Sequence, residues 1–197
     1  MAGKVAQRRD ALRKKLIDIA EERIAEGGVA SVKARDLAKA ADCALGAIYN
    51  VFGDLHDVII EVNGRTFRKL GAFVAERLED DKDELPTERL ITMAHAYLDF
   101  AADHPNSWRA QFDVNMAGNM DVPQWYIDEL LRLFGHISSP VKECFPEMNE
   151  TEVDLMTRAL FASVHGNVLL GLENRISAVP RSELKRMLAV LLSKATQ

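Results

Sequence analysis

The sequence has few cysteines and no long apolar run. Cys43 and Cys144 are its only cysteines in 197 residues, too few and too far apart for a disulfide framework or a structural zinc site. Apolar stretches such as Val168-Leu169-Leu170 fall far short of the roughly 18 residues that a membrane span needs. The first residues are basic and lack the apolar core of a secretory signal. We therefore expect a cytoplasmic protein with no membrane partner.

Enzyme and cofactor signatures are also missing. The sequence contains no Walker loop and no Gly-x-Gly-x-x-Gly, Cys-x-x-Cys or Gly-x-Ser-x-Gly motif. None of its five histidines follows a carboxylate by three residues, the spacing found in helical di-iron proteins. These absences predict a protein that holds no metal, needs no cofactor and is not an enzyme, with an all-α enzyme as the weakest alternative.

Charge is spread unevenly along the chain. The first 15 residues carry six basic side chains and one acidic one, whereas the whole chain has a net charge of −5. An acidic body with a basic end is typical of a protein that touches a polyanion with one end only. A solvated, frayed terminus explains the same pattern, so charge alone leaves both interpretations open.

Helical periodicity runs through nearly the whole sequence. Apolar residues recur every three or four positions, as at Leu12, Leu16 and Ile19. No stretch alternates with the period of two that marks a β-strand. The pattern predicts an all-α protein of about nine helices.

Capping residues mark several expected helix ends. Asp54 with Asp57, and Asn149 with Glu152, have the spacing of an N-cap residue and a first-turn acid. Pro140 is expected to end the helix before it, because proline disrupts a helix interior.

A helix-turn-helix is the most informative local pattern. Two short helices predicted over residues 34–41 and 45–51 are joined by about three residues, the spacing of this motif. Ala38, Ala41 and Ala44 are small enough to let the two helices touch. The second helix presents a short, weakly charged face that can enter a major groove. Three short helices also make ordinary cores, so the spacing alone leaves both DNA binding and simple packing open.

Residues 9–60 resemble the N-terminal domain of TetR/AcrR-type transcriptional regulators. The residues that carry the resemblance are Ile19-Ala20, Gly27 or Gly28, Leu37-Ala38-Lys39-Ala40-Ala41, Leu45-Gly46-Ala47-Ile48-Tyr49 and Val51-Phe52-Gly53-Asp54. Gly46, Tyr49 and Phe52 form its most specific part. The resemblance implies a DNA-binding domain over residues 1–60, with the helix-turn-helix at about 33–52. It further implies a helical effector-binding and dimerisation domain over residues 61–197.

Four positions depart from the family pattern. Asp42 stands at the turn glycine, and Asp tolerates a left-handed backbone better than most residues. Ala44 replaces a serine N-cap, which costs about 1 kcal/mol. Lys33 replaces a hydroxyl residue, so we expect Ser31 to cap from a shifted start. Leu55-His56 replaces a Lys-Glu pair and removes one expected phosphate contact.

The resemblance also implies which residues contact DNA. They lie at the start of the first motif helix and along the second: Lys33, Arg35, Ala44, Leu45, Gly46, Ala47, Tyr49, Asn50 and Val51. A basic N-terminal arm adds Arg8, Arg9 and Arg13, with Lys14 and Lys15 as further candidates. For Arg35 a solvated surface cation is the alternative, and for Tyr49 it is a packing role.

Small residues mark a candidate dimer surface. Ala159, Ala162, Ser163 and Gly166 recur at helical spacing, and the last helix adds Leu184, Leu188 and Leu191. The resemblance implies that two such helices from each of two copies form a four-helix bundle, with packing inside one chain as the alternative. Residues 161–166 also resemble a subgroup with a Trp…His-Gly signature, with Phe161 in place of the tryptophan.

Aromatic and methionine residues supply candidates for an effector pocket. They are Met93, Tyr97, Trp108, Phe112, Met116, Trp125, Tyr126, Phe161 and His165. Residues of these types at helical spacing also build ordinary cores, and a hydrogen-bonded core histidine is the alternative for His165.

The sequence thus predicts a ligand-responsive, homodimeric repressor. Its expected partners are double-stranded DNA with a palindromic operator, a second copy of itself and an unidentified small-molecule effector. A helical regulator or adaptor with weakened DNA binding is the main alternative.

Overall fold

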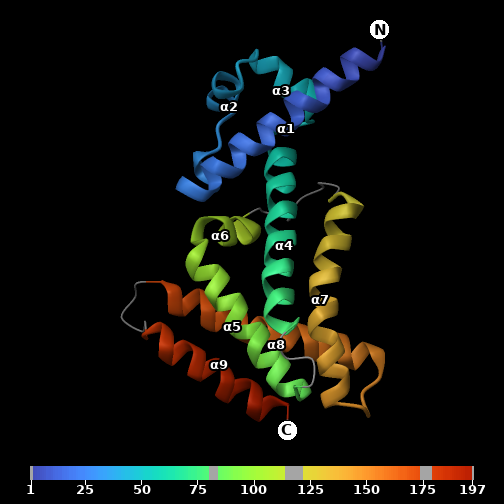
Figure 1. Cartoon of the computed structure of the whole chain (residues 1–197), viewed down its shortest axis with the longest axis vertical. Helices are drawn as coiled ribbons and strands as arrows, with labels where there is room; N and C mark the ends of the chain where they lie inside the picture. Colours follow the sequence, from blue (N-terminus) through green and yellow to red (C-terminus); the bar gives the residue numbers. More distant parts are fainter. Residues whose placement is uncertain (1, 80–83, 114–121, 174–178, 197) are drawn as a thin grey trace. The chain divides into compact units, whose positions relative to one another are not determined.

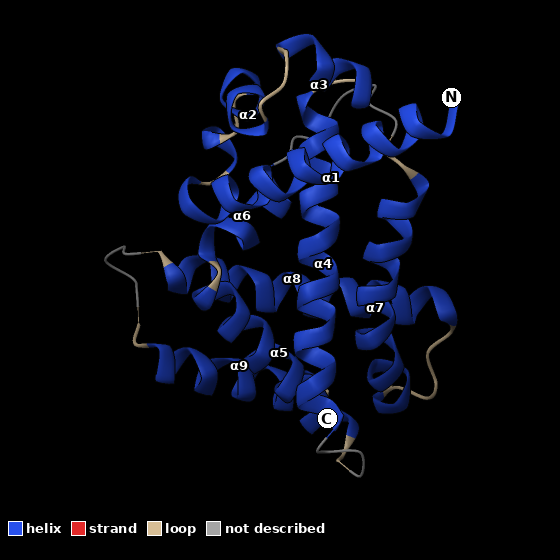
Figure 2. Ribbon diagram, turned by 45° about the horizontal axis from the view of Figure 1, so that its top comes forward, coloured by secondary structure: helices blue, strands red, loops and turns tan. Residues whose placement is uncertain are grey.

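The computed structural model describes residues 2–79, 84–113, 122–173 and 179–196. These residues form nine α-helices and one short 3-10 helix, and none of them lies in a β-strand (Figures 1 and 2). The predicted all-α fold is confirmed. The helices are α1 (Ala2–Gly27), the 3-10 helix η1 (Val29–Ser31), α2 (Ala34–Ala41), α3 (Leu45–Val51), α4 (Leu55–Glu79), α5 (Pro86–Asp103), α6 (Pro105–Asp113), α7 (Gln124–Cys144), α8 (Glu150–Leu172) and α9 (Arg181–Ala195).

The helices gather into two compact units. Unit 1 contains Met1–Arg68 and His104–Tyr126, and unit 2 contains Lys69–Asp103 and Ile127–Gln197. Helix α4 contributes its first part to unit 1 and its last part to unit 2. This division groups α6 with the N-terminal helices. The functional boundary near residue 60 that the resemblance implies stays a prediction.

The core of unit 1 is built around α1. Leu16 and Ile24 of α1 are fully buried in one cluster with Leu37 of α2 and Ile48 of α3. Val58, near the start of α4, is fully buried in the same cluster. Burial of each such side chain stabilises the fold by roughly 1.5–3 kcal/mol, so the two short helices α2 and α3 are held by packing and not by helix propensity.

Helix α6 belongs to the same unit through hydrogen bonds as well as packing. Asn106 donates from Nδ2 to the carbonyl oxygens of Ala25 (2.9 Å) and Glu26 (3.1 Å) near the end of α1. Asn63 of α4 donates from its buried Nδ2 to the carbonyl oxygen of Ala110 in α6 at 2.9 Å. These bonds satisfy carbonyl groups while tying α1, α4 and α6 together.

Both predicted N-caps are confirmed. The Asp57 N–H donates to Asp54 Oδ1 at 3.0 Å, and the Asp54 N–H donates to Asp57 Oδ2 at 3.2 Å. Asn149 and Glu152 make the same reciprocal pair at 3.1 and 2.9 Å at the start of α8. Each pair satisfies two backbone donors that the first helical turn leaves unpaired.

The expectation that Pro140 ends a helix is wrong. Helix α7 contains Pro140 and continues to Cys144. Pro140 is buried, and Val141 after it is fully buried. Burial of these two side chains offsets the helical hydrogen bond that proline cannot donate.

In unit 2, α9 packs against both α5 and α8. Leu98 of α5, Val168 of α8 and Leu188 of α9 are fully buried. Gly171 lets α8 and α9 approach closely, because a Cβ atom there would lie 2.3 Å from Cδ2 of Leu184. The glycine is therefore required by the packing of α8 on α9.

A charged cluster ties α5 to α9. Asp99 accepts hydrogen bonds from Arg181 Nη2 at 2.8 Å and from Lys185 Nζ at 2.9 Å. Burial by itself would raise the pKa of Asp99, but the hydrogen bonds and positive charges of Lys185 and Arg181 lower it below its ordinary value.

Candidate functional site

The turn between α2 and α3 has the backbone conformation of a helix-turn-helix. Asp42 has φ 55° and ψ 52°, in the left-handed region, and its N–H faces the carbonyl oxygens of Ala38 and Lys39. The Cys43 N–H donates to the carbonyl oxygen of Ala38 at 3.0 Å. The prediction that Asp42 occupies the position of the turn glycine is supported, since Asp is among the few residues that adopt this conformation readily.

Buried apolar residues fix both motif helices on α1. Leu37 and Ile48 are fully buried, and Phe52 after α3 is 5% exposed. Ala38 and Ala41 are buried where α2 meets its neighbours. The inner faces of the two helices are therefore fixed, and only their outer faces are free to meet a ligand.

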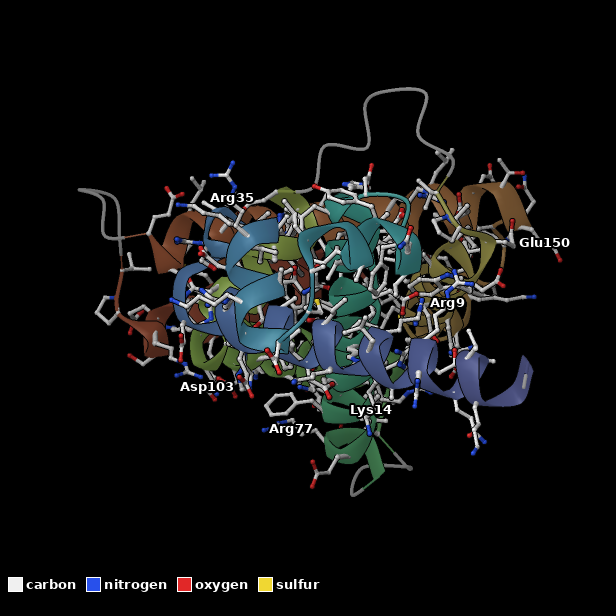
Figure 3. All side chains as sticks on the ribbon, turned by 90° about the horizontal axis from the view of Figure 1, so that it is seen from above. Arg9, Lys14, Arg35, Arg77, Asp103 and Glu150 are labelled. Carbon is white, nitrogen blue, oxygen red and sulfur yellow. The ribbon has the colours of Figure 1, made fainter. Side chains whose placement is uncertain are left out.

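The start of α2 carries two exposed basic residues. Lys33 is the N-cap residue and makes no side-chain capping bond, and Arg35 projects outward from α2 (Figure 3). The expectation that Ser31 caps this helix is wrong. Its Oγ donates instead to the carbonyl oxygens of Arg23 (2.8 Å) and Gly28 (2.6 Å), because residues 29–31 form a 3-10 turn that precedes α2.

The outer face of α3 is exposed and carries no charge. The helix reads Leu-Gly-Ala-Ile-Tyr-Asn-Val, and its N-cap Ala44 makes no side-chain capping bond, as expected. Leu45 and Tyr49 are 40% and 48% exposed, and Ala44, Gly46 and Asn50 are exposed as well. Ala47 and Val51 are half-buried. Five of the predicted DNA-contact residues at α3 are thus exposed and two are half-buried, and their contact with DNA stays a prediction.

Two basic residues of α1 hold the motif in place, a role that the sequence did not reveal. Arg13 forms an ion pair with Glu61 of α4, and its guanidinium lies 5.1 Å from the ring centroid of Phe52. Lys15 donates from Nζ to the carbonyl oxygen of Ala41, the last residue of α2, at 2.8 Å. A cation at a helix C-terminus is favourable. Arg13 and Lys15 thus join α1 to α4 and α2, and their contact with DNA stays a prediction.

The other basic residues of the predicted arm lie along α1. Residues 2–27 form one continuous helix, so these side chains are set at helical angles along it. Arg8, Arg9 and Lys14 are exposed. Figure 3 shows Arg9 and Lys14 on different sides of α1. Arg8, Arg9 and Lys14 therefore do not all lie on one face of α1.

Four of the candidate effector residues lie in unit 1. Trp108 and Tyr126 are 1% and 2% exposed, Trp125 is half-buried, and Phe112 is 47% exposed. The Trp125 ring covers Gly64, where a Cβ atom would lie 2.4 Å from its Cζ3. Met116 lies outside the described residues.

A buried polar pair in unit 1 was not predicted. Asn63 is fully buried beside Tyr126, and the rings of Tyr126 and Phe67 lie 5.1 Å apart. Burial raises the pKa of the Tyr126 phenol, and Asn63 partly offsets this rise. The sequence offered one sign of this pair, because Asn63 interrupts the apolar stripe of α4.

The other four candidates lie in unit 2, where Tyr97, Phe161 and His165 contact one another. The Tyr97 hydroxyl and Nδ1 of His165 lie 2.8 Å apart, and the Phe161 ring stacks on His165 at 5.7 Å. Met93 is half-buried on α5. Phe134, which the sequence did not single out, lies 5.0 Å from Phe161. Burial lowers the pKa of His165 below its ordinary value, which favours the neutral imidazole, whose Nδ1 can accept a hydrogen bond from the Tyr97 hydroxyl.

The predicted dimer residues divide between surface and core. Ala159, Ala162 and Ser163 are exposed on α8, and Gly166 and Leu191 are half-buried. Leu184 and Leu188 are 3% and 0% exposed, so their predicted role at an interface is corrected: they pack against α5 and α8 of the same chain. The large apolar side chains that α8 and α9 expose are Leu155, Leu170, Met187 and Val190.

We also searched the described residues for a metal site and for a helix that could span a membrane. Among them, no group of three or more His, Cys, Asp or Glu side chains could hold a metal ion. One helix in the same part of the chain, α8, is long and apolar enough to cross a membrane by length and composition alone. Core and interface helices share these properties, so the observation is weak.

Comparison with known proteins identifies a matching family and solved structures with the same fold. A family model for the tetracyclin repressor-like C-terminal domain matches residues 90–193, just over half of the chain. No curated protein matches the sequence.

Solved structures share the fold at low identity. A protein with unknown function from Rhodococcus sp. RHA1 is 19% identical, with a TM-score of 0.75 over 93% of this chain and 94% of that one. The regulator FadR from Bacillus subtilis, solved with stearoyl-CoA, is 22% identical, with a TM-score of 0.67 over 92% and 98%. RolR, solved with resorcinol, is 21% identical, with a TM-score of 0.67 over 97% and 94%.

The family match and the helix-turn-helix geometry come from different parts of the chain, and both are typical of the same kind of protein. The matched segment begins in α5, whereas the motif occupies α2 and α3. The chain belongs to the tetracycline-repressor-like (TetR) family of transcriptional regulators.

Proposed function

We propose that this chain is a homodimeric repressor that binds a palindromic operator and releases it when a small molecule binds. The observation that carries the proposal is the α2–α3 motif, which has a buried inner side and an exposed outer face on α3. This is what a recognition helix requires, because one side must be rigidly held while the other meets base edges. The family assignment agrees, since its members are regulators and not enzymes.

Basic residues around the motif are suited to the DNA backbone. Lys33 and Arg35 at the start of α2 and Arg8 and Arg9 on α1 are exposed. Positive side chains next to a helix N-terminus favour a phosphate, which the helix dipole also attracts. We assign them to phosphate contacts that set the position of α3, while α3 itself reads the bases.

The exposed side of α8 supports dimerisation. Leu155, Ala159, Ala162 and Leu170 are exposed and recur at helical spacing. An apolar helical stripe left open by its own chain is typical of an interface. A second copy packed there gives a two-fold axis, and the operator then has two half-sites about 34–36 Å apart or a multiple of this distance.

The aromatic group of unit 2 is our candidate effector site. Tyr97 and His165 supply a hydroxyl and a neutral imidazole, and Phe134 and Phe161 supply ring faces. Rings with a few polar groups suit a small aromatic molecule that can form hydrogen bonds. RolR, whose structure holds resorcinol, gives an example of such a ligand on this fold.

The test is selection of DNA by the full-length chain from duplexes with a randomised core. We expect enrichment of one palindromic sequence, binding by a dimer in sedimentation, and affinity that falls steeply with salt. A folded protein that enriches no sequence and shows no mobility shift at low salt would contradict the proposal. That result would favour the adaptor interpretation.

A further inference from the structure

The outer face of α3 offers very few hydrogen-bonding groups. Tyr49 and Asn50 are its only polar side chains, and it carries no lysine, arginine, aspartate or glutamate. The commonest specific contact to guanine uses a bidentate arginine or lysine, which α3 cannot supply. An apolar face in the major groove has a single natural partner, the 5-methyl group of thymine.

Leu45 is the apolar side chain best placed for such a contact. It lies in the first turn of α3 and is 40% exposed, whereas Ile48 of the same helix is fully buried. Tyr49 follows Leu45 by four residues, so both lie on one face of the helix. The fold therefore leaves Leu45 open at the position where the N-terminal residues of a recognition helix meet base edges.

Gly46 leaves this face open to close approach from outside the chain. A Cβ atom at Gly46 would meet no atom within 4 Å, and Gly28 is the only glycine of positive φ in the described part of the chain. Neither packing nor backbone conformation requires glycine here, although glycine destabilises a helix relative to alanine. Close approach of a base or sugar beside Leu45 accounts for the missing side chain.

We propose that α3 reads an A·T-rich half-site, with Leu45 packed on a thymine 5-methyl group and Asn50 available to an adjacent adenine. This inference rests on the proposed function, because it requires α3 to lie in a major groove. It adds the chemical class of sequence that the protein recognises and names Leu45 as the residue that sets it.

The test uses the duplex selected by the full-length chain, with each thymine replaced in turn by deoxyuridine, which lacks only the 5-methyl group. We expect at least one position in each half-site where the replacement lowers affinity about fourfold, the value of one buried methyl group. For Leu45→Ala we expect weaker binding and equal affinity for thymine and uracil at that position. Leu85→Ala, another change at an exposed leucine, serves as the control and keeps the wild-type ratio.

Each outcome bears on a separate claim. Sequence-selective binding that is indifferent to every uracil, or a Leu45→Ala protein that still discriminates fully, overturns the inference and leaves the proposed function standing. Failure to bind any duplex overturns the proposed function and the inference together. Thermal unfolding of Leu45→Ala near the wild-type midpoint shows that a loss of discrimination is not a loss of fold.

Discussion

Single residues show which features serve the fold and which face outward. A side chain at Gly64 or Gly171 would force its neighbour to move, because a Cβ atom would lie 2.4 Å from Trp125 and 2.3 Å from Leu184. Gly46, Gly135 and Gly166 have no neighbour within 4 Å of that position. Glycine makes a helix less stable than alanine does, and at these positions no neighbour in the chain requires it. For Gly46 and Gly166 we expect that a binding partner requires the small residue.

The change Gly46→Ala should separate stability from DNA binding. It should raise the free energy of unfolding by about 0.5–1 kcal/mol, because alanine is the better helix former. It should weaken operator binding about fivefold or more, if the added methyl group costs about 1 kcal/mol against DNA. Denaturant unfolding and mobility shifts measure the two effects.

The matched control for that variant is Gly135→Ala, since the same substitution on α7 also meets open space. It should raise stability by a similar amount and leave operator affinity unchanged. A Gly46→Ala protein that binds its operator as tightly as the wild type would remove Gly46 from the interface.

The neutral imidazole of His165 makes stability depend on pH. Its folded-state pKa lies below 6.5, so between the two pKa values the unfolded chain binds more protons than the folded one. The stabilisation is fully present above pH 6.5 and is lost as the pH falls through the folded-state pKa. We expect the fall in melting temperature from pH 7.5 to 5.5 to be smaller in His165→Gln. The exposed His136 gives the control, His136→Gln, which should retain the wild-type fall.

Elements show how far sequence could predict this structure. The Asp54–Asp57 and Asn149–Glu152 caps and the turn at Asp42 were predictable, because each depends on residues within a few positions of one another. The Arg13–Glu61 ion pair was not, since its partners are 48 residues apart in the chain.

The failures at Pro140 and along α9 have the same physical cause. A hydrophobic stripe gives the direction of a helix face but cannot name what covers it. Leu184 and Leu188 were expected at a partner and pack within the chain. Pro140 was expected to end a helix, and tertiary burial overrode the local preference. The candidate site on α3 was predictable as a motif, whereas the positioning role of Arg13 and Lys15 depends on how distant parts of the chain pack.

Helix α1 carries basic residues that we propose to contact DNA and others that make contacts within the chain, and salt dependence can separate the two sets. Replacing Arg8 and Arg9 with Gln should lower the slope of log affinity against log salt by about 0.9 for each phosphate that the protein no longer neutralises. Stability should hardly change, because both side chains are exposed. Arg13→Gln should instead lower the melting temperature, since its ion pair joins α1 to α4.

Binding isotherms at several salt concentrations, with exposed Arg132→Gln in unit 2 as control, measure the slopes. An unchanged slope after both changes would remove Arg8 and Arg9 from the DNA interface.

At the scale of the whole molecule, assembly decides whether the seven residues of α3, our proposed recognition helix, can specify a genomic site. One such helix reads only a few base pairs, too few against roughly a million or more competing sites. Two copies on a two-fold axis double the readout and demand a palindrome. The exposed stripe of α8 is where we expect the second copy, so dimerisation and DNA affinity should disappear together.

The change Gly166→Leu tests this coupling. Within the monomer, a Cβ atom at Gly166 meets nothing within 4 Å. Between two copies, the same side chain should hold the helices apart and cost about 1–3 kcal/mol on each side of the two-fold axis. We expect a folded, helical monomer in sedimentation that no longer binds the operator tightly. Gly135→Leu, on α7 and equally unhindered, should remain dimeric and bind normally. A Gly166→Leu protein that stays dimeric on its operator would place the interface on another face.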